Sequence, residues 1–174
     1  MQKTMKLQKQ SNMKKLIVLV LSAFILFNLS FTINAAEKTD INDKIVSIET
    51  EDLGNGYIKE TIITETTPST NERSLAVSKS GSKTVNFKNS SNQVLWSLTV
   101  KGTFLYDQYT SSCTASSVST NVKDSNWRIT SSSADRGGNT AYGYATAKRY
   151  LAGVVVQTVN ETVSLSCSKT GVLS

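Results

Sequence analysis

The feature that most constrains this chain is a regular alternation of apolar and polar residues from Val94 to Tyr106. From Trp96 to Phe104, the apolar residues and Gly102 share one parity, while Ser97, Thr99, Lys101 and Thr103 occupy the other. A period of two places successive side chains on opposite faces of a β-strand, so one face meets a core and the other meets water. No stretch shows a convincing helical period. We therefore expect an all-β fold.

Further strand signals surround this segment, with turn residues between them. In order, they are Val85 with Phe87, Trp127 with Ile129, Thr140 to Leu151, and Val154 to Cys167; the turns are at 89–92, at 135–139 and at Ala152-Gly153. The apolar parity of the last strand changes, which predicts a β-bulge near Gln157 or Thr158. We predict a single antiparallel β-sandwich over residues 74–174, rich in Ser and Thr and immunoglobulin-like in size.

The first 35 residues have the three parts of a secretory signal peptide. Five lysines precede an apolar run from Leu16 to Phe31, and small residues follow it. We expect cleavage after Ala35, with Ala36 as the runner-up. The alternative is a membrane anchor, but the run is shorter than the roughly 20 residues that a spanning helix needs. The protein is therefore expected to be secreted and extracellular.

Residues 36–73 form an acidic segment with a net charge of −5, whereas residues 74–174 carry +6. Ile45 to Ile48 and Tyr57 to Ile63 flank a turn at 52–56, which predicts a β-hairpin. Thr64 to Arg73 is polar and contains the only proline, a composition typical of a linker. Two strands alone are marginally stable in water, so the hairpin either docks on the body or stays loose.

The composition excludes several classes of protein. The chain has 174 residues and a formal net charge of +6, but five of the basic residues belong to the expected leader, which leaves +1. An exported, nearly neutral chain is not expected to meet nucleic acid. There is no histidine, no paired carboxylate motif and no nucleophile elbow, so we expect no enzyme, no metal site and no cofactor.

Cys113 and Cys167 are the only cysteines, and both lie in the expected exported part. An oxidising compartment favours one disulfide between them. The competing interpretation is a pair of free thiols. A redox-active pair is disfavoured because the spacing is not Cys-x-x-Cys.

The strand from Thr140 to Leu151 contains the best candidate for a binding surface. Tyr142, Tyr144, Lys148 and Tyr150 share one parity, and alanines and a glycine share the other; Arg149 lies next to them in the sequence. If the small residues face the core, an aromatic and cationic ladder faces outward, where it suits sugars or a wall polymer. The opposite orientation, with the tyrosines in the core, is equally compatible with the pattern. Cross-strand tyrosine pairs that only stabilise the sheet are a third interpretation.

Several segments resemble a family of small secreted β-rich proteins of Gram-positive bacteria. They are Lys83 to Ser91, Val94 to Phe104, Ser112 to Thr114, Trp127 to Ser131, Ala145 to Tyr150 and Leu165 to Cys167. The resemblance covers about residues 83–174. It implies export, a β-domain and the Cys113–Cys167 pair, and it transfers no catalytic residue.

Three functions are compatible with these features. The leading hypothesis is a non-enzymatic binding module that acts at a cell surface, on a wall polymer or a glycan. The second is a bacteriocin-like or otherwise membrane-active protein, whose acidic pro-segment is removed near Arg73; only this hypothesis requires a membrane partner. The third is a coat or matrix protein that assembles through exposed sheet edges.

Overall fold

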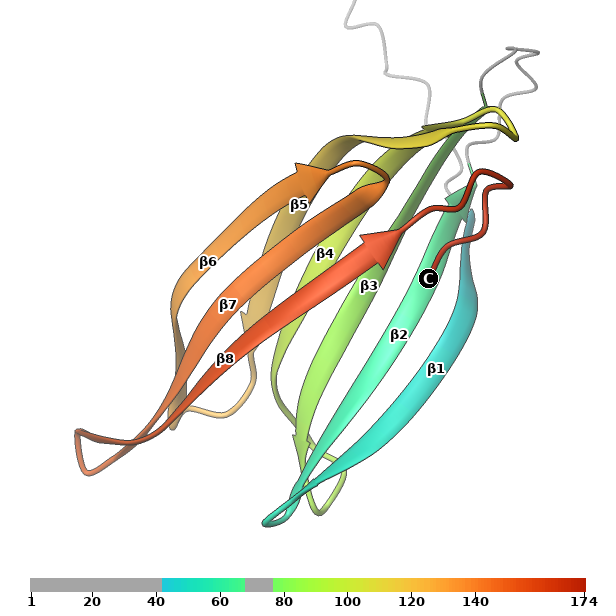
Figure 1. Cartoon of the computed structure of the whole chain (residues 1–174). Helices are drawn as coiled ribbons and strands as arrows, with labels where there is room; N and C mark the ends of the chain where they lie inside the picture. Colours follow the sequence, from blue (N-terminus) through green and yellow to red (C-terminus); the bar gives the residue numbers. More distant parts are fainter. Residues whose placement is uncertain (1–41, 68–76) are drawn as a thin grey trace, which may run out of the picture. The chain divides into compact units, whose positions relative to one another are not determined.

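The computed structural model describes residues 42–67 and 77–174, and in these ranges it contains strands and turns but no helix. The strands are β1 (Asn42–Gly54), β2 (Tyr57–Thr67), β3 (Val77–Asn89), β4 (Val94–Tyr106), β5 (Ser111–Val122), β6 (Trp127–Gly137), β7 (Thr140–Leu151) and β8 (Val154–Ser166). All pairings are antiparallel and form two sheets, ordered β1-β2-β3-β4-β5 and β6-β7-β8 (Figure 1). The prediction of an all-β, antiparallel, sandwich-like fold is confirmed.

The core lies between the two sheets, and large side chains of one sheet meet small side chains of the other. On β4, Trp96, Leu98, Val100 and Phe104 are fully buried. On β7, the residues that face them are alanines and Gly143. A Cβ added at Gly143 would lie only 3.1 Å from Val100 Cβ, so the two sheets are in close contact here. The small face of β7 allows the sheets to approach closely enough to bury the large side chains of β4.

Aromatic rings tie the ends of the two sheets together. Tyr57 of β2 packs on Phe87 of β3 at a ring-centroid distance of 4.8 Å, and Phe87 lies 5.3 Å from Trp96. Trp127 of β6 reaches across from the other sheet to 6.2 Å from Trp96. Because Tyr57 belongs to the N-terminal hairpin, this cluster anchors the hairpin to the rest of the molecule.

The N-terminal hairpin is an integral part of the larger sheet. β2 pairs with β3 continuously from Tyr57–Asn89 to Thr66–Ser80, and Ile63 is buried. The predicted start of the linker at Thr64 is wrong, because residues 64–67 belong to β2. Residues 68–73, with Arg73, and the leader with Ala35 lie outside the described residues.

The predicted disulfide is wrong for this structure, in which Cys113 and Cys167 are both free. The two backbones flank the β6–β7 turn: the Cys113 N–H donates to Gly138 O and the Cys167 N–H donates to Asn139 O. Each thiol donates to a nearby backbone carbonyl: Cys113 Sγ to Ala115 O at 3.2 Å, and Cys167 Sγ to Ser168 O at 3.5 Å. The two cysteines therefore flank this turn without a bond between them, although their number, the expected compartment and the resemblance to secreted proteins all predict a disulfide.

The predicted bulge in the last strand is present. The pairing of β7 with β8 steps from Arg149–Gln157 to Tyr150–Val155, so Val156 is the extra residue. It lies one position before the predicted site. Because of the bulge, Val154, opposite Leu151, lies on the same side of the sheet as Val163 and Leu165 although its parity differs from theirs.

Candidate functional site

β7 turns its tyrosines away from the core. Ala141, Gly143, Ala145 and Ala147 are buried, whereas Tyr144 is exposed and Tyr142 and Tyr150 are half-buried. Tyr142, Tyr144, Lys148 and Tyr150 therefore lie on the outer face of the β6-β7-β8 sheet. Of the two orientations open from the sequence, the structure has the one with small residues inside.

Tyr142 and Tyr144 form an aromatic pair in the middle strand of this sheet. Their ring centroids are 6.4 Å apart, and their planes are 18° from parallel. Short polar residues oppose them on both sides: Ser133 and Thr162 pair with Tyr144, and Asp135 and Ser164 pair with Tyr142. We call this surface, with Lys148 and Tyr150, the tyrosine face. It offers aromatic surface beside hydroxyl and carboxylate groups.

The other end of the tyrosine face is cationic. The Arg128 guanidinium lies over the Tyr150 ring, 4.9 Å from its centroid. Lys148 is the cross-strand partner of Arg128. A cation stacked on an aromatic ring stays accessible to an anionic group on a ligand.

Arg149 does not belong to the tyrosine face. It pairs with the buried Trp127, so its side chain points to the opposite side of the sheet. There its Nη1 donates to the Tyr57 hydroxyl at 3.1 Å, and that hydroxyl donates to Gln157 Oε1, also at 3.1 Å. Arg149, Tyr57 and Trp127 border a hollow of about 270 Å³ at the ends of the two sheets. Arg149 therefore has a structural partner, and its grouping with the tyrosines is not supported by the geometry.

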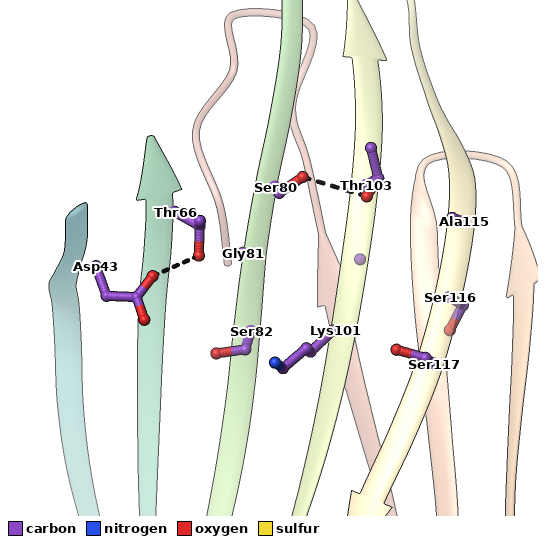
Figure 2. Close-up of a pocket in the computed structure, with 11 residues that line it drawn as sticks. Asp43, Thr66, Ser80, Gly81, Ser82, Lys101, Thr103, Ala115, Ser116 and Ser117 are labelled. Carbon is purple, nitrogen blue, oxygen red and sulfur yellow. Dashed lines mark hydrogen bonds between the residues drawn. The ribbon is translucent and has the colours of Figure 1, made fainter. Parts of the chain in front are cut away.

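A second hollow, of about 380 Å³, lies on the five-stranded sheet and is lined largely by hydroxyl groups (Figure 2). Several of these groups bond to one another: Thr66 Oγ1 donates to Asp43 at 2.7 Å, and Ser80 Oγ and Thr103 Oγ1 are 3.2 Å apart. The Lys101 side chain lies beside Ser82 in Figure 2, and it makes no ion pair with the described residues. With no aromatic side chain in its lining, this hollow is the weaker candidate for ligand binding.

Besides Asp107, whose pKa is lowered by hydrogen bonds from the Thr110 and Tyr109 N–H groups, two carboxyl groups have perturbed pKa values, and neither makes an acid–base site with a nucleophile. Burial raises the pKa of Glu161, which Lys59 partly offsets. Hydrogen bonds from Lys88 and Asn86 lower the pKa of Glu60. Neither carboxyl lines either hollow. Among residues 42–67 and 77–174, no group of three or more Cys, Asp or Glu side chains is placed to hold a metal ion.

No family model, curated protein or solved structure matches this chain. The resemblance to secreted Gram-positive proteins therefore stays a prediction. Within the described ranges, no helix is long and apolar enough to cross a membrane.

The sequence reasoning missed the hydroxyl-lined hollow. Its residues come from five strands, and their alternation with core residues marks them only as an outer face. Only the register, which brings Thr66, Ser80 and Thr103 into one row, shows that they are neighbours.

Proposed function

We propose that this protein is a secreted, non-enzymatic binding module that acts at a cell surface and binds a wall polymer or glycan through its tyrosine face. The observation that carries the proposal is the outward orientation of Tyr142 and Tyr144, with near-parallel rings set among hydroxyl groups. Pyranose rings pack their apolar C–H surfaces on aromatic rings, and their hydroxyl groups need hydrogen-bond partners nearby.

The cationic end supports a wall polymer that carries phosphate or carboxylate. Arg128 and Lys148 lie on the same face as the tyrosines. A polymer that runs along β7 would meet aromatic rings first and cations next. The rigid sheet favours this type of recognition, because a preformed surface loses little conformational entropy on binding.

The membrane-active alternative with a removable pro-segment has less support. Removal of residues 42–67 takes Tyr57 from the aromatic cluster and leaves β3 unpaired on one edge. Such a cut strips part of the core instead of releasing an independent prodomain.

The assembly alternative rests on β1, an edge strand whose Ile45 and Ile48 are more than half exposed. The same strand carries Lys44, Glu49, Glu51 and Asp52, and charges on an edge strand oppose open-ended pairing with other chains. Size-exclusion profiles that do not change with concentration are expected, and a growing assembly would favour this alternative.

The proposal is tested by retention of residues 36–174 on purified Gram-positive wall polymers and on a glycan array. This form lacks the expected leader and keeps every described strand. Retention on at least one polymer or glycan class is expected. No retention on any of them, from a protein that is folded by circular dichroism, contradicts the proposal.

A further inference from the structure

The turn between β7 and β8 carries an uninterrupted run of exposed apolar residues. It reads Leu-Ala-Gly-Val-Val-Val over residues 151–156, with no polar side chain. Leu151 and Val154 are 62% and 65% exposed, and Val155 and Val156 are also exposed. Four large apolar side chains at one exposed turn form a patch that needs an explanation.

This tip extends beyond the rest of its sheet. The last residue pair between β6 and β7 is Trp127–Arg149, and the Tyr150 N–H donates to Asn126 O just before β6, so residues 151–155 continue as two strands without a third strand beside them. Figure 1 shows the β7–β8 hairpin ending in a free turn past the start of β6. Residues 151–156 are all exposed.

The charges beside the tip favour an anionic partner. Arg128 is exposed and stacks on Tyr150, directly behind the tip, and Lys148 lies opposite it. Of the carboxylates, Asp124 in the β5–β6 loop accepts the Asn126 N–H, and Glu161 lies deeper along β8 with Lys59. An apolar tip followed by an aromatic ring and cations is the arrangement that suits a bilayer interface with anionic headgroups.

We propose that the β7–β8 tip inserts shallowly into an anionic lipid bilayer and holds the protein at the membrane surface. A second copy of the chain fits less well, because a few side chains at a narrow turn fall short of the roughly 800 Å² per partner of a stable interface. A bilayer accepts a projecting tip without shape complementarity. The apolar tip is separate from Tyr142 and Tyr144, but it shares Arg128, Lys148 and Tyr150 with the cationic end of the tyrosine face. Insertion of the tip does not depend on glycan binding.

The turn itself limits the depth of insertion. Ala152 and Gly153 both have positive φ, 48° and 81°, in a tight two-residue turn. Peptide groups of a turn that have no partner in the strand ladder need water or headgroups, which the hydrocarbon core does not offer. Leu151 and Val154 therefore enter the interfacial region while Arg128 stays at the headgroups.

The test is co-sedimentation of residues 36–174 with vesicles of phosphatidylglycerol and phosphatidylcholine, and with vesicles of phosphatidylcholine alone. Binding is expected to the anionic vesicles and to be much weaker on the neutral ones. Val154→Asp is expected to abolish it. The matched control is Val172→Asp, at a valine that is 60% exposed in another part of the molecule, and it is expected to bind like the wild type.

Two further variants separate charge from insertion. Arg128→Gln is expected to weaken binding about fivefold, and Arg128→Lys is expected to retain it, since one cation near the surface contributes about 1 kcal/mol. In Leu151→Trp, the fluorescence emission of the new tryptophan is expected to shift to shorter wavelength on anionic vesicles, because the side chain leaves water. Trp96 and Trp127 are buried and contribute little to this change.

Three results would overturn the inference: no binding to anionic vesicles, equal binding by the wild type and Val154→Asp, or a dimer in solution that Val154→Asp dissociates. Tyr144→Ala is expected to leave vesicle binding unchanged. Failure of the lipid site is therefore distinguishable from failure of the tyrosine face.

Discussion

Arg149 of β7 donates a 3.1 Å hydrogen bond to the hydroxyl of Tyr57, a residue of the N-terminal hairpin. This bond links the acidic front of the chain to its basic body across the two sheets. Tyr57 also packs on Phe87 and meets Trp127 edge-on. The hairpin is thus held by a main-chain ladder, by aromatic packing and by a charge-assisted hydrogen bond.

Tyr57→Phe is expected to destabilise the fold by about 1 kcal/mol, because Arg149 and Gln157 both lose a partner while the ring remains. Urea denaturation measures the change. Tyr109→Phe, at a tyrosine that is 87% exposed, serves as the control and is expected to have no effect. Equal stability of Tyr57→Phe and wild type would mean that the bond contributes nothing to folding.

A cut in the segment 68–76 is expected to leave the hairpin bound. The cut is made by a specific protease whose recognition site is introduced at Arg73. Because β2 remains paired with β3 and Ile63 remains buried, both fragments are expected to co-elute in size exclusion and to separate only in denaturant. Release of the N-terminal fragment without denaturant would instead support the pro-segment hypothesis.

Gly143→Ala is expected to cost about 1 kcal/mol of stability by overpacking. Its new Cβ would lie 3.1 Å from Val100 Cβ and 3.3 Å from Val118 Cγ2. Gly137→Ala is the matched control, since its Cβ would meet nothing nearer than Tyr142 at 3.7 Å. Thermal unfolding of both variants measures the difference, and an unchanged Gly143→Ala would show that the sheets do not pack as closely as described.

Lys88 is buried, and its ammonium group pairs with Glu60, which also accepts a hydrogen bond from Asn86 at 2.8 Å. Glu60→Gln is expected to destabilise the protein by about 2 kcal/mol at neutral pH. The folded-state pKa of Glu60 is lowered, first by the bond from Lys88. Its stabilising effect is therefore complete above the ordinary Glu pKa and is lost as the pH falls through the lowered value.

The wild type and Glu60→Gln should consequently converge in stability in acid. Urea midpoints at neutral and acidic pH measure this. A stability difference that is the same at both pH values would show that the carboxylate charge is not the cause.

The two thiols are expected to differ in reactivity. Cys167 is fully buried and Cys113 is partly exposed, and burial raises the pKa of both. Ellman's reagent is expected to modify Cys113 slowly and Cys167 only after unfolding. Since the unfolded thiols ionise first, stability should fall as the pH rises above their ordinary pKa. An unfolded protein with no reactive thiol would establish a disulfide.

The sequence predicted best where one face of a strand is strongly apolar. The strand from Val94 to Tyr106 has the bounds expected from its alternation. β5, by contrast, was not identified, because its twelve residues are mostly Ser, Thr and small side chains and none is fully buried. Its partner β4 and its register, not its own pattern, define it as a strand.

The orientation of β7 and the place of Arg149 could not be derived from the sequence for a physical reason. Both faces of β7 are compatible with a core, and only the large residues of β4 across the interface select the small one. Lys148 and Arg149 are adjacent in the chain, but neighbours on a strand point to opposite faces. Adjacency in sequence therefore grouped two cations that the fold separates.

A binding titration shows whether the tyrosine face binds the ligand. The polymer or glycan that best retains residues 36–174 is titrated by calorimetry into the wild type, into Tyr144→Ala and into Tyr109→Ala, which removes an even more exposed tyrosine elsewhere. We expect saturable binding by the wild type, a loss of affinity of about fivefold or more in Tyr144→Ala, and no change in Tyr109→Ala. Equal affinity of all three proteins, or no binding by the wild type, would contradict this expectation.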